Sequence, residues 1–228
     1  MTGALAEVRV SRKGEERLRS GHPWVFGDDL RDVPPGLPPG QWAWVRSRAG
    51  EPLGTATINL GSRIALRRVS RSEVLPTEGF LGERLREAAD RRAEAGMDGE
   101  RALRVLYSEG DFLPGVIADR YGDVLSVQIL TAGMEIVRAL LLDVLERRFR
   151  PRLIYERSEG AGRRHEGLAE RKGPARGEGP TREEIETDGV RFSVDVEAGP
   201  KTGFFLDQRR NRAIVRDHIL DSFSVAKF

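Results

Sequence analysis

The stretch from Glu78 to Gly96 has the spacing of an amphipathic helix, and it separates two regions built from short β segments. Leu81, Leu85 and Ala88 recur on one face of this helix, with arginine and glutamate on the other. The apolar runs in the flanking regions are short and bounded by glycine and proline, as is typical of strands. A chain of 228 residues with this pattern favours two small units over one large core. We therefore predict a domain boundary near residue 72.

The region before this boundary, residues 1–72, is predicted to form a compact, mostly β barrel. Ser11 can cap one or two helical turns, which Gly21 would end. Four prolines make residues 33–40 a rigid loop. Strands are expected at residues 24–26, 42–45, 52–58 and 63–69.

The region after the helix is predicted to form an α+β sandwich, which gives a central domain over residues 73–198. The expected order is strand, strand, helix, strand, strand. Strands are expected at 103–107, 115–120, 124–129 and 153–156, residues 185–186 with 190–196 are expected to form another, and a helix is expected at 134–149. Between them, residues 158–181 hold six glycines and two prolines and are expected to form a long mobile loop.

Composition excludes several kinds of site. The chain has no cysteine, which excludes disulfides, thiolate metal sites and cysteine nucleophiles within it. Its three histidines, His22, His165 and His218, are far apart, so no metal site is predicted. No apolar run approaches the roughly 20 residues that span a bilayer. Since no secretion signal is visible either, we expect a cytoplasmic protein that has no membrane partner.

Basic residues are in excess at the N-terminal end. Residues 1–72 carry 12 arginines and lysines against 7 acidic residues, although the whole chain has a net charge of only +2. Three of the basic residues lie close in sequence to two aromatic rings, a combination that suits RNA. These residues are Arg12, Lys13, Arg17, His22 and Trp24. The alternative interpretation is a solvated helix with Trp24 in the core, and both stay open.

The segment from Gly199 to Arg212 combines sharp turns with a predicted helix start. Asp207 can cap a helix that begins at Gln208. Basic and amide side chains would then converge on a carboxylate or phosphate near the helix N-terminus. These side chains are Lys201, Gln208, Arg209 and Arg212. The alternative is an ordinary helix start, with Phe204 and Phe205 in the core and the arginines in solvent.

Two carboxylates, Glu109 and Asp111, lie in a short run that also contains glycine and Pro114. Paired carboxylates of this kind can perform general acid–base chemistry. The simpler interpretation is a tight turn that feeds a hairpin, and we favour it here.

Three segments, taken together and in order, resemble one protein family. Gly21-His22-Pro23-Trp24-Val25-Phe26 resembles the opening signature of a PUA domain. The run from Glu109 to Asp123 (EGDFLPGVIADRYGD) resembles the central-domain signature of PUA-containing S-adenosylmethionine-dependent methyltransferases. Lys201 to Arg209 (KTGFFLDQR) resembles the segment that leads into their Rossmann domain. The likeness covers about residues 8 to 216.

The resemblance implies a role in methylating ribosomal RNA, typically carbon 5 of a cytosine in the large-subunit RNA. It implies a PUA-like domain for RNA, a central α+β domain, and residues 199–228 as the start of a Rossmann methyltransferase domain. By the same likeness, S-adenosylmethionine is the expected cofactor and ribosomal RNA the expected partner. The residues expected to border the cofactor are Lys201, Thr202, Phe204, Asp207, Gln208 and Arg209. Arg212 joins the residues expected to contact RNA.

The sequence also departs from this family. The glycine-rich loop that holds S-adenosylmethionine would lie beyond residue 220, and it is absent. Methylation of cytosine carbon 5 needs a cysteine thiolate, which this chain lacks. Residues 220–226 resemble the family's first Rossmann strand with its glycine turn removed. We therefore expect a truncated chain without a Rossmann domain, without catalytic residues of its own and inactive alone.

Three functions remain open at this point. The first is the RNA-binding portion of an rRNA cytosine methyltransferase. The second is a catalytically inactive, stand-alone RNA-binding module, which the positive N-terminal region favours. The third is a subunit that pairs with a separate Rossmann domain through exposed apolar residues. The oligomeric state is open as well, with a homodimer among the alternatives.

Overall fold

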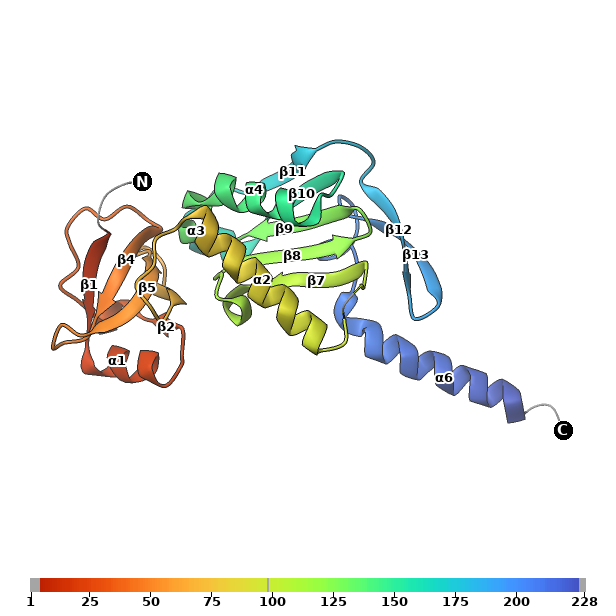
Figure 1. Cartoon of the computed structure of the whole chain (residues 1–228), viewed down its shortest axis with the longest axis horizontal. Coiled ribbons are helices and arrows are strands. Elements are labelled where there is room, and N and C mark those ends of the chain that lie inside the picture. Colours follow the sequence, from red (N-terminus) through yellow and green to blue (C-terminus); the bar gives the residue numbers. More distant parts are fainter. Residues whose placement is uncertain (1–4, 98, 226–228) are drawn as a thin grey trace.

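The N-terminal region folds into a six-stranded sheet with one helix against it (Figure 1). This structure is a computed structural model, and it describes residues 5–97 and 99–225. The strands are β1 (Ala6–Val10), β2 (Trp24–Val25), β3 (Leu30–Arg31), β4 (Gln41–Arg46), β5 (Pro52–Ile58) and β6 (Leu66–Ser70), in the spatial order β2-β6-β5-β4-β1-β3. The sequence pattern predicted four of these strands, and it missed β1 and β3.

Helix α1 (Arg12–Arg19) begins where the sequence predicts. The Ser11 hydroxyl accepts a hydrogen bond from the Gly14 amide at 3.1 Å, which satisfies one unpaired donor of the first turn. The same hydroxyl donates to Asp29 of the short 3₁₀ helix Gly27–Asp29. Gly21 follows the helix at a φ of +97°, a conformation that favours glycine.

The central unit, residues 78–177, is a five-stranded sheet with helices across one face. Its strands are β7 (Ala102–Tyr107), β8 (Val116–Tyr121), β9 (Val124–Ile129), β10 (Leu153–Ser158) and β11 (Arg171–Gly177), in the order β11-β10-β9-β8-β7. The helices are α2 (Glu78–Glu94), α3 (Ala132–Ile136), α4 (Arg138–Phe149) and α5 (Ala161–His165). The prediction of one helix at 134–149 was wrong at Val137, where α3 and α4 meet.

Residues 158–181 form ordered structure, so the prediction of a mobile loop was wrong. They contain α5 and β11, and β11 pairs antiparallel with β10 from Leu153 to Ser158. Arg163 is fully buried and donates to the Ile129 carbonyl and the Glu135 carboxylate. A segment rich in glycine and arginine is predicted to be a loop from its composition. Here the pairing of β11 with β10 and the hydrogen bonds of the buried Arg163 give it a fixed structure.

Residues 185–186 and 190–196, predicted to form one strand of the sandwich, lie in the two strands of a separate hairpin, which corrects the expected sandwich. β12 (Arg182–Thr187) and β13 (Val190–Asp195) pair only with each other. The edge of β10 is already taken by β11, so no place in the main sheet is left for them there. Instead, Ile185 and Val194 pack against Tyr121 and Tyr155 in a small core of their own.

The chain ends in a helix that projects from the body (Figure 1). A short 3₁₀ helix, η3 (Leu206–Gln208), precedes α6 (Arg209–Val225). The strand expected at residues 220–226 is therefore not formed, because α6 continues through Val225; residue 226 lies outside the described part. Within that part, no helix is long and apolar enough to cross a membrane.

The two regions share a core. Trp42 and Val69 of the N-terminal sheet belong to the same buried cluster as Phe80 and Leu81 of α2. The indole ring of Trp42 meets Phe80 edge to face at 5.8 Å, and its Nε1 donates to the Gly133 carbonyl at 3.0 Å. Trp42 is therefore a core residue.

Candidate functional site

The segment that follows β13 is anchored to the main sheet through Thr202. This side chain is buried, and its hydroxyl hydrogen-bonds with Asp119 on β8 and with the Tyr121 hydroxyl at 3.0 Å. Asp119 in turn accepts two hydrogen bonds from Arg104, at 2.8 and 2.9 Å. Thr202 thus positions the segment, and its hydroxyl faces the protein interior.

Phe204 also faces the fold. Its ring lies 4.9 Å from that of Phe192 on β13, and its backbone amide donates to the Tyr121 hydroxyl at 3.2 Å. Burial and the nearby Asp119 carboxylate raise the pKa of Tyr121 above its ordinary value, so this hydroxyl stays protonated. Phe205, which the alternative interpretation of this segment placed in the core, is 40% exposed.

Lys201 and Asp207 form an exposed ion pair across the turn. The ammonium of Lys201 donates to both carboxylate oxygens of Asp207, at 2.9 and 3.0 Å, and lies 4.6 Å from the Phe205 ring centre. The hydrogen bond from Lys201 lowers the pKa of Asp207. The helix begins at Arg209, after Gln208, so the predicted capping role of Asp207 was wrong: its carboxylate is held by Lys201.

The basic residues of this segment do not converge on a shared anion position. Arg209 donates to Asp188 at 3.0 Å and to Glu100 at 2.9 Å, and these hydrogen bonds raise its pKa. Arg212 lies over the Phe204 ring at 4.7 Å and donates to the Phe205 carbonyl. Carboxylates from the β12–β13 turn (Asp188) and from the loop between α2 and β7 (Glu100) pair with Arg209, which sequence spacing could not predict.

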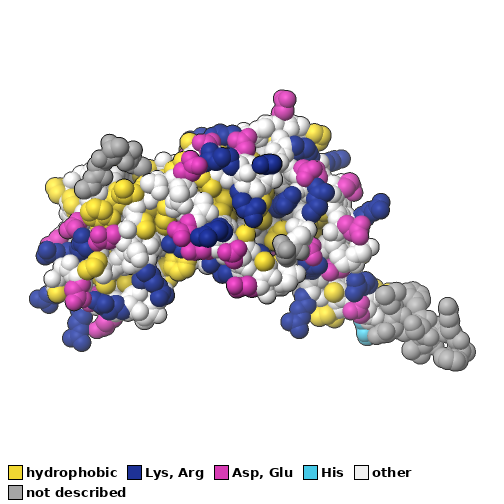
Figure 2. All heavy atoms as spheres, in the orientation of Figure 1, with side chains coloured by type: hydrophobic (Ala, Val, Ile, Leu, Met, Phe, Trp, Pro, Cys, Tyr) yellow, Lys and Arg dark blue, Asp and Glu magenta, His cyan; other side chains and the backbone are white. Residues whose placement is uncertain are grey.

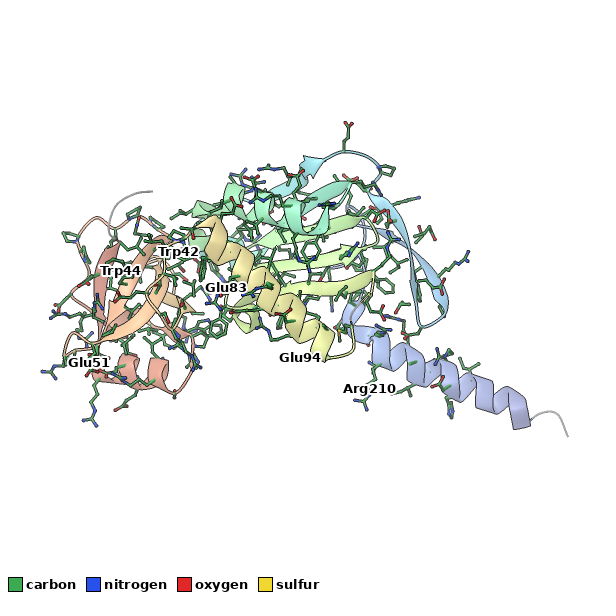
Figure 3. The ribbon with its side chains drawn as sticks, in the orientation of Figure 1. Trp42, Trp44, Glu51, Glu83, Glu94 and Arg210 are labelled. Carbon is green, nitrogen blue, oxygen red and sulfur yellow. The ribbon has the colours of Figure 1, made fainter. Side chains whose placement is uncertain are left out.

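A groove of about 750 Å³ lies between the end of α2, strand β7 and the base of α6. Figure 3 shows Arg210 on the first turn of α6 and Glu94 near the end of α2, the two helix ends that flank the groove. Of the six residues predicted to border the cofactor, only Asp207 and Arg209 line it. The other four do not line the groove. Thr202 and Phe204 face the protein interior, Lys201 is paired with Asp207, and Gln208 is exposed. These six residues therefore do not fit a complete S-adenosylmethionine site by themselves.

The residues predicted to contact RNA are split between two ends of the molecule. Arg12 and Lys13 are exposed at the start of α1, whereas Arg212 lies on α6 at the opposite end (Figure 1). Arg17 is half-buried with its guanidinium 4.9 Å from the Phe26 ring centre. Basic and acidic side chains are interspersed over the face in Figure 2, without one large patch of a single sign.

Trp24 and His22 lie at the contact between the N-terminal sheet and the central unit. The two rings meet edge to face at 5.6 Å, and Trp24 Nε1 donates to Glu109 at 2.8 Å. Arg67 donates to the same carboxylate at 3.2 Å and to Glu166 at 3.1 Å. Trp24 is therefore neither a pure core residue nor a free stacking surface: it joins the two regions.

The Glu109–Asp111 run is a turn, as favoured from sequence. It forms the 3₁₀ helix η2 (Ser108–Asp111), and Asp111 is buried with hydrogen bonds from Arg91, Arg92 and the Tyr107 amide. Sequence reasoning missed the contact at Glu166, which accepts from Asn59 at 2.9 Å. Glu166 and Asn59 are 107 positions apart, so no local pattern connects them.

Comparison with known proteins first defines the class of the N-terminal region. Residues 8–71 match the family of PUA-like domains, so the fold is α+β with an N-terminal PUA-like domain. Two solved structures share the fold of most of the chain. SMU.776, described as a methyltransferase in complex with SAH, aligns with a TM-score of 0.74 at 22% identity, covering 91% of this chain and 52% of that one. A Streptococcus mutans structure described as SAM-dependent gives the same score and identity.

Relatives with higher identity carry a more specific name. The chain is 36% identical over 218 residues to ribosomal RNA large subunit methyltransferase I of Tolumonas auensis, covering 94% of this chain and 55% of that protein. It is 38% identical over 213 residues to the protein of that name from Shewanella denitrificans, covering 91% and 54%. The chain thus spans about half the length of the curated relatives it matches.

Proposed function

We propose that this chain is part of an S-adenosylmethionine-dependent methyltransferase that acts on large-subunit ribosomal RNA, with cytosine carbon 5 as the methylated atom. The observation that carries the proposal is the identity of 36–38% to ribosomal RNA large subunit methyltransferase I over more than nine-tenths of the chain. A cytoplasmic location belongs to the same proposal.

The role proposed for these residues is to bind RNA and to hold the PUA-like domain in a set orientation. Trp24 and Arg67 of that domain donate to Glu109, and Asn59 and Arg67 donate to Glu166. The shared core around Trp42 adds a second, apolar contact. RNA held by the PUA-like domain would therefore keep a constant position relative to the segment at residues 199–212.

The chemistry of carbon-5 methylation needs a thiolate that adds to the base. This chain has no cysteine, and its six expected cofactor residues do not complete a cofactor site. In this proposal, S-adenosylmethionine supplies the methyl group, and both the thiolate and the remaining cofactor contacts come from outside these 228 residues.

RNA binding can be tested by titrating the purified chain with large-subunit rRNA at several salt concentrations. We expect affinity to fall linearly with salt on logarithmic axes, with a slope that reports the number of phosphates neutralised. Lys13→Ala, which removes an exposed charge at the start of α1, should lower that slope by about one. The absence of rRNA affinity at low salt would refute the proposed function.

Catalysis gives a second test. The chain alone, mixed with S-adenosylmethionine and rRNA that lacks the modification, should transfer no methyl group above the level of a boiled control. Methyl transfer by these 228 residues would contradict the role assigned to them.

A subunit that pairs with a separate catalytic domain is the second candidate function. Three apolar side chains of α6, Ile214, Val215 and Ile219, are 58%, 57% and 48% exposed. Exposed apolar surface of this kind is typical of protein contacts. Co-purification of the chain with a methyltransferase domain encoded elsewhere would favour this candidate.

A further inference from the structure

An exposed aromatic ring lies in the groove between α2, β7 and α6. Tyr107, the last residue of β7, is 55% exposed and lines that groove. The Arg104 guanidinium lies over this ring, 5.4 Å from its centre. A tyrosine that is more than half exposed contributes little to a core, whereas an exposed ring beside a guanidinium plane is the kind of surface on which a nucleic-acid base stacks.

Two buried carboxylates hold this surface in place. Asp119 accepts both hydrogen bonds of the Arg104 fork, through Nε and Nη2, which fixes the plane of the guanidinium. Asp111 accepts from the Tyr107 amide at 2.6 Å and from Arg91 and Arg92 at 2.7 Å. One carboxylate thus orients two arginines and the backbone that carries the ring. Because these side chains are already held in place, they need not rearrange when a ligand binds.

The charges that line the groove favour an anionic ligand. Five arginines line it, of which Arg92, Arg104 and Arg209 are held by carboxylates, and the two aspartates that line it, Asp188 and Asp207, each have a basic partner. Arg210 is exposed and has no ion pair among the described residues. Arg91 is 40% exposed and uses a single nitrogen on Asp111. Both therefore keep donors that could reach a phosphate.

The free edge of β7 is also a possible docking site for a peptide strand, because β7 is the last strand of its sheet. The arginines and the exposed ring distinguish between the two kinds of partner. A peptide added to the edge needs backbone groups and side-chain pockets, whereas phosphates and bases need cations and aromatic faces. The arginines and the exposed ring of the groove therefore favour phosphates and bases over a peptide strand.

We propose that this groove binds single-stranded RNA, with a base stacked on Tyr107 and Arg104 and the backbone phosphates at Arg91 and Arg210. The proposal rests on the proposed function, since it names a second RNA contact of the same protein. The PUA-like domain lies at the other end of α2 (Figure 1). An α-helix of 17 residues is about 25 Å long, so an RNA that reaches both places must extend over at least that span.

Binding of a labelled single-stranded RNA octamer to the complete chain, measured by fluorescence anisotropy, tests this groove. Tyr107→Ala should weaken binding about 5- to 100-fold, the effect of losing one stacked base, while Tyr107→Phe keeps the ring and should stay within about twofold. Arg210→Ala should lower the salt slope by about one. Arg86→Ala, an exposed arginine of α2 outside the groove, serves as the matched control and should leave the slope unchanged.

The outcomes separate this proposal from the proposed function. Loss of octamer affinity in Tyr107→Ala and Arg210→Ala, with unchanged melting temperatures, supports the groove as an RNA site. If both variants bind the octamer as wild type does, the groove does not bind RNA, although rRNA affinity of the wild-type chain would leave the proposed function standing. A wild-type chain that binds structured rRNA but not the octamer overturns the groove proposal in the same way. Absence of affinity for either RNA overturns both.

Discussion

Glu166 is a buried carboxylate whose partners come from both sides of the contact between the PUA-like domain and the central unit. It accepts from Asn59 at 2.9 Å, from Arg67 at 3.1 Å and from the Ala132 amide at 3.3 Å. Burial opposes its ionisation, but the hydrogen bonds from Asn59 and Ser62 and the charge of Arg67 outweigh burial and lower the pKa of Glu166. The ionised form is therefore part of the native contact.

Replacing Glu166 with glutamine should destabilise the protein by about 2–3 kcal/mol at neutral pH, because an amide nitrogen would face donors that a carboxylate satisfies. A carboxyl whose native pKa is lowered stabilises the fold above its unfolded pKa of about 4.3 and loses that contribution as the pH falls through the native value. The difference in the free energy of unfolding between wild type and Glu166→Gln, measured with urea, should therefore be largest at pH 7 and should shrink below about pH 4.

Glu178→Gln is the matched control, since Glu178 is exposed and has no ion pair among the described residues. It should change stability by less than about 0.5 kcal/mol at either pH. A difference between wild type and Glu166→Gln that does not depend on pH would show that the charge of Glu166 is not what stabilises the contact.

At the scale of elements, helix α3 approaches the PUA-like sheet closely because it carries a glycine. A Cβ on Gly133 would lie 2.3 Å from Thr57 on β5, and one on Gly40 would lie 2.3 Å from the Ala132 carbonyl. Gly40 also has a φ of +83°, which a larger residue rarely adopts. The two glycines thus permit close approach between regions that are far apart in sequence, Gly40 to the backbone of α3 and Gly133 to the Thr57 side chain.

Gly133→Ala should lower stability by about 1–3 kcal/mol, because the added methyl must displace Thr57 or move α3. Gly82→Ala in α2 is the opposite case: a Cβ there meets nothing within 4 Å. In a helix interior that change should stabilise by about 0.5–1 kcal/mol. Thermal melts of both variants test this prediction. Equal changes in melting temperature for the two substitutions would contradict it.

The elements that sequence pattern predicted well are those whose signal is local. Helix α2 has a capping Thr77 and a regular apolar face, and the β8–β9 hairpin has Gly122 at a φ of +57°. Strand β11 has no such signal: its residues are Arg171 to Gly177, and it is an edge strand defined by its pairing with β10. Edge strands with polar side chains carry little hydrophobic pattern, which is why a loop was predicted there.

At the scale of the whole molecule, the PUA-like domain and the central unit are joined by apolar and ionic contacts together. The largest core cluster includes Trp42 and Val69 from one and Phe80 and Leu81 from the other. Two regions that share a core in this way lose each other's packing when either one unfolds.

We therefore expect both regions to unfold in a single calorimetric transition at neutral pH. The van't Hoff and calorimetric enthalpies should agree. Trp42→Ala removes the packing on Phe80 and the hydrogen bond to Gly133, and it should lower stability by about 3–5 kcal/mol or separate the transition into two. Two transitions in the wild-type chain would show that the regions are independent.

The candidate site shows the limit of sequence spacing most clearly. The segment at residues 199–212 carries basic residues that suggest a shared anion, yet Arg209 is paired with Glu100 and Asp188, and Lys201 with Asp207. Spacing specifies which groups are near one another along the chain. It does not specify which carboxylates from other elements neutralise them.

The amino-acid sequence by itself determined the α+β composition, helices α1 and α2 and the strands of the β8–β9 hairpin, because capping, apolar period and turn residues act within a few positions. It also determined the resemblance of the N-terminal region to PUA domains. Only the tertiary structure decided that residues 158–181 are ordered, that β12 and β13 form a sheet apart from the main one, that Trp24 contacts Glu109, and that Asn59 contacts Glu166. These features depend on pairing, burial and charge between residues up to 107 positions apart, and such contacts leave no periodic signal along the chain.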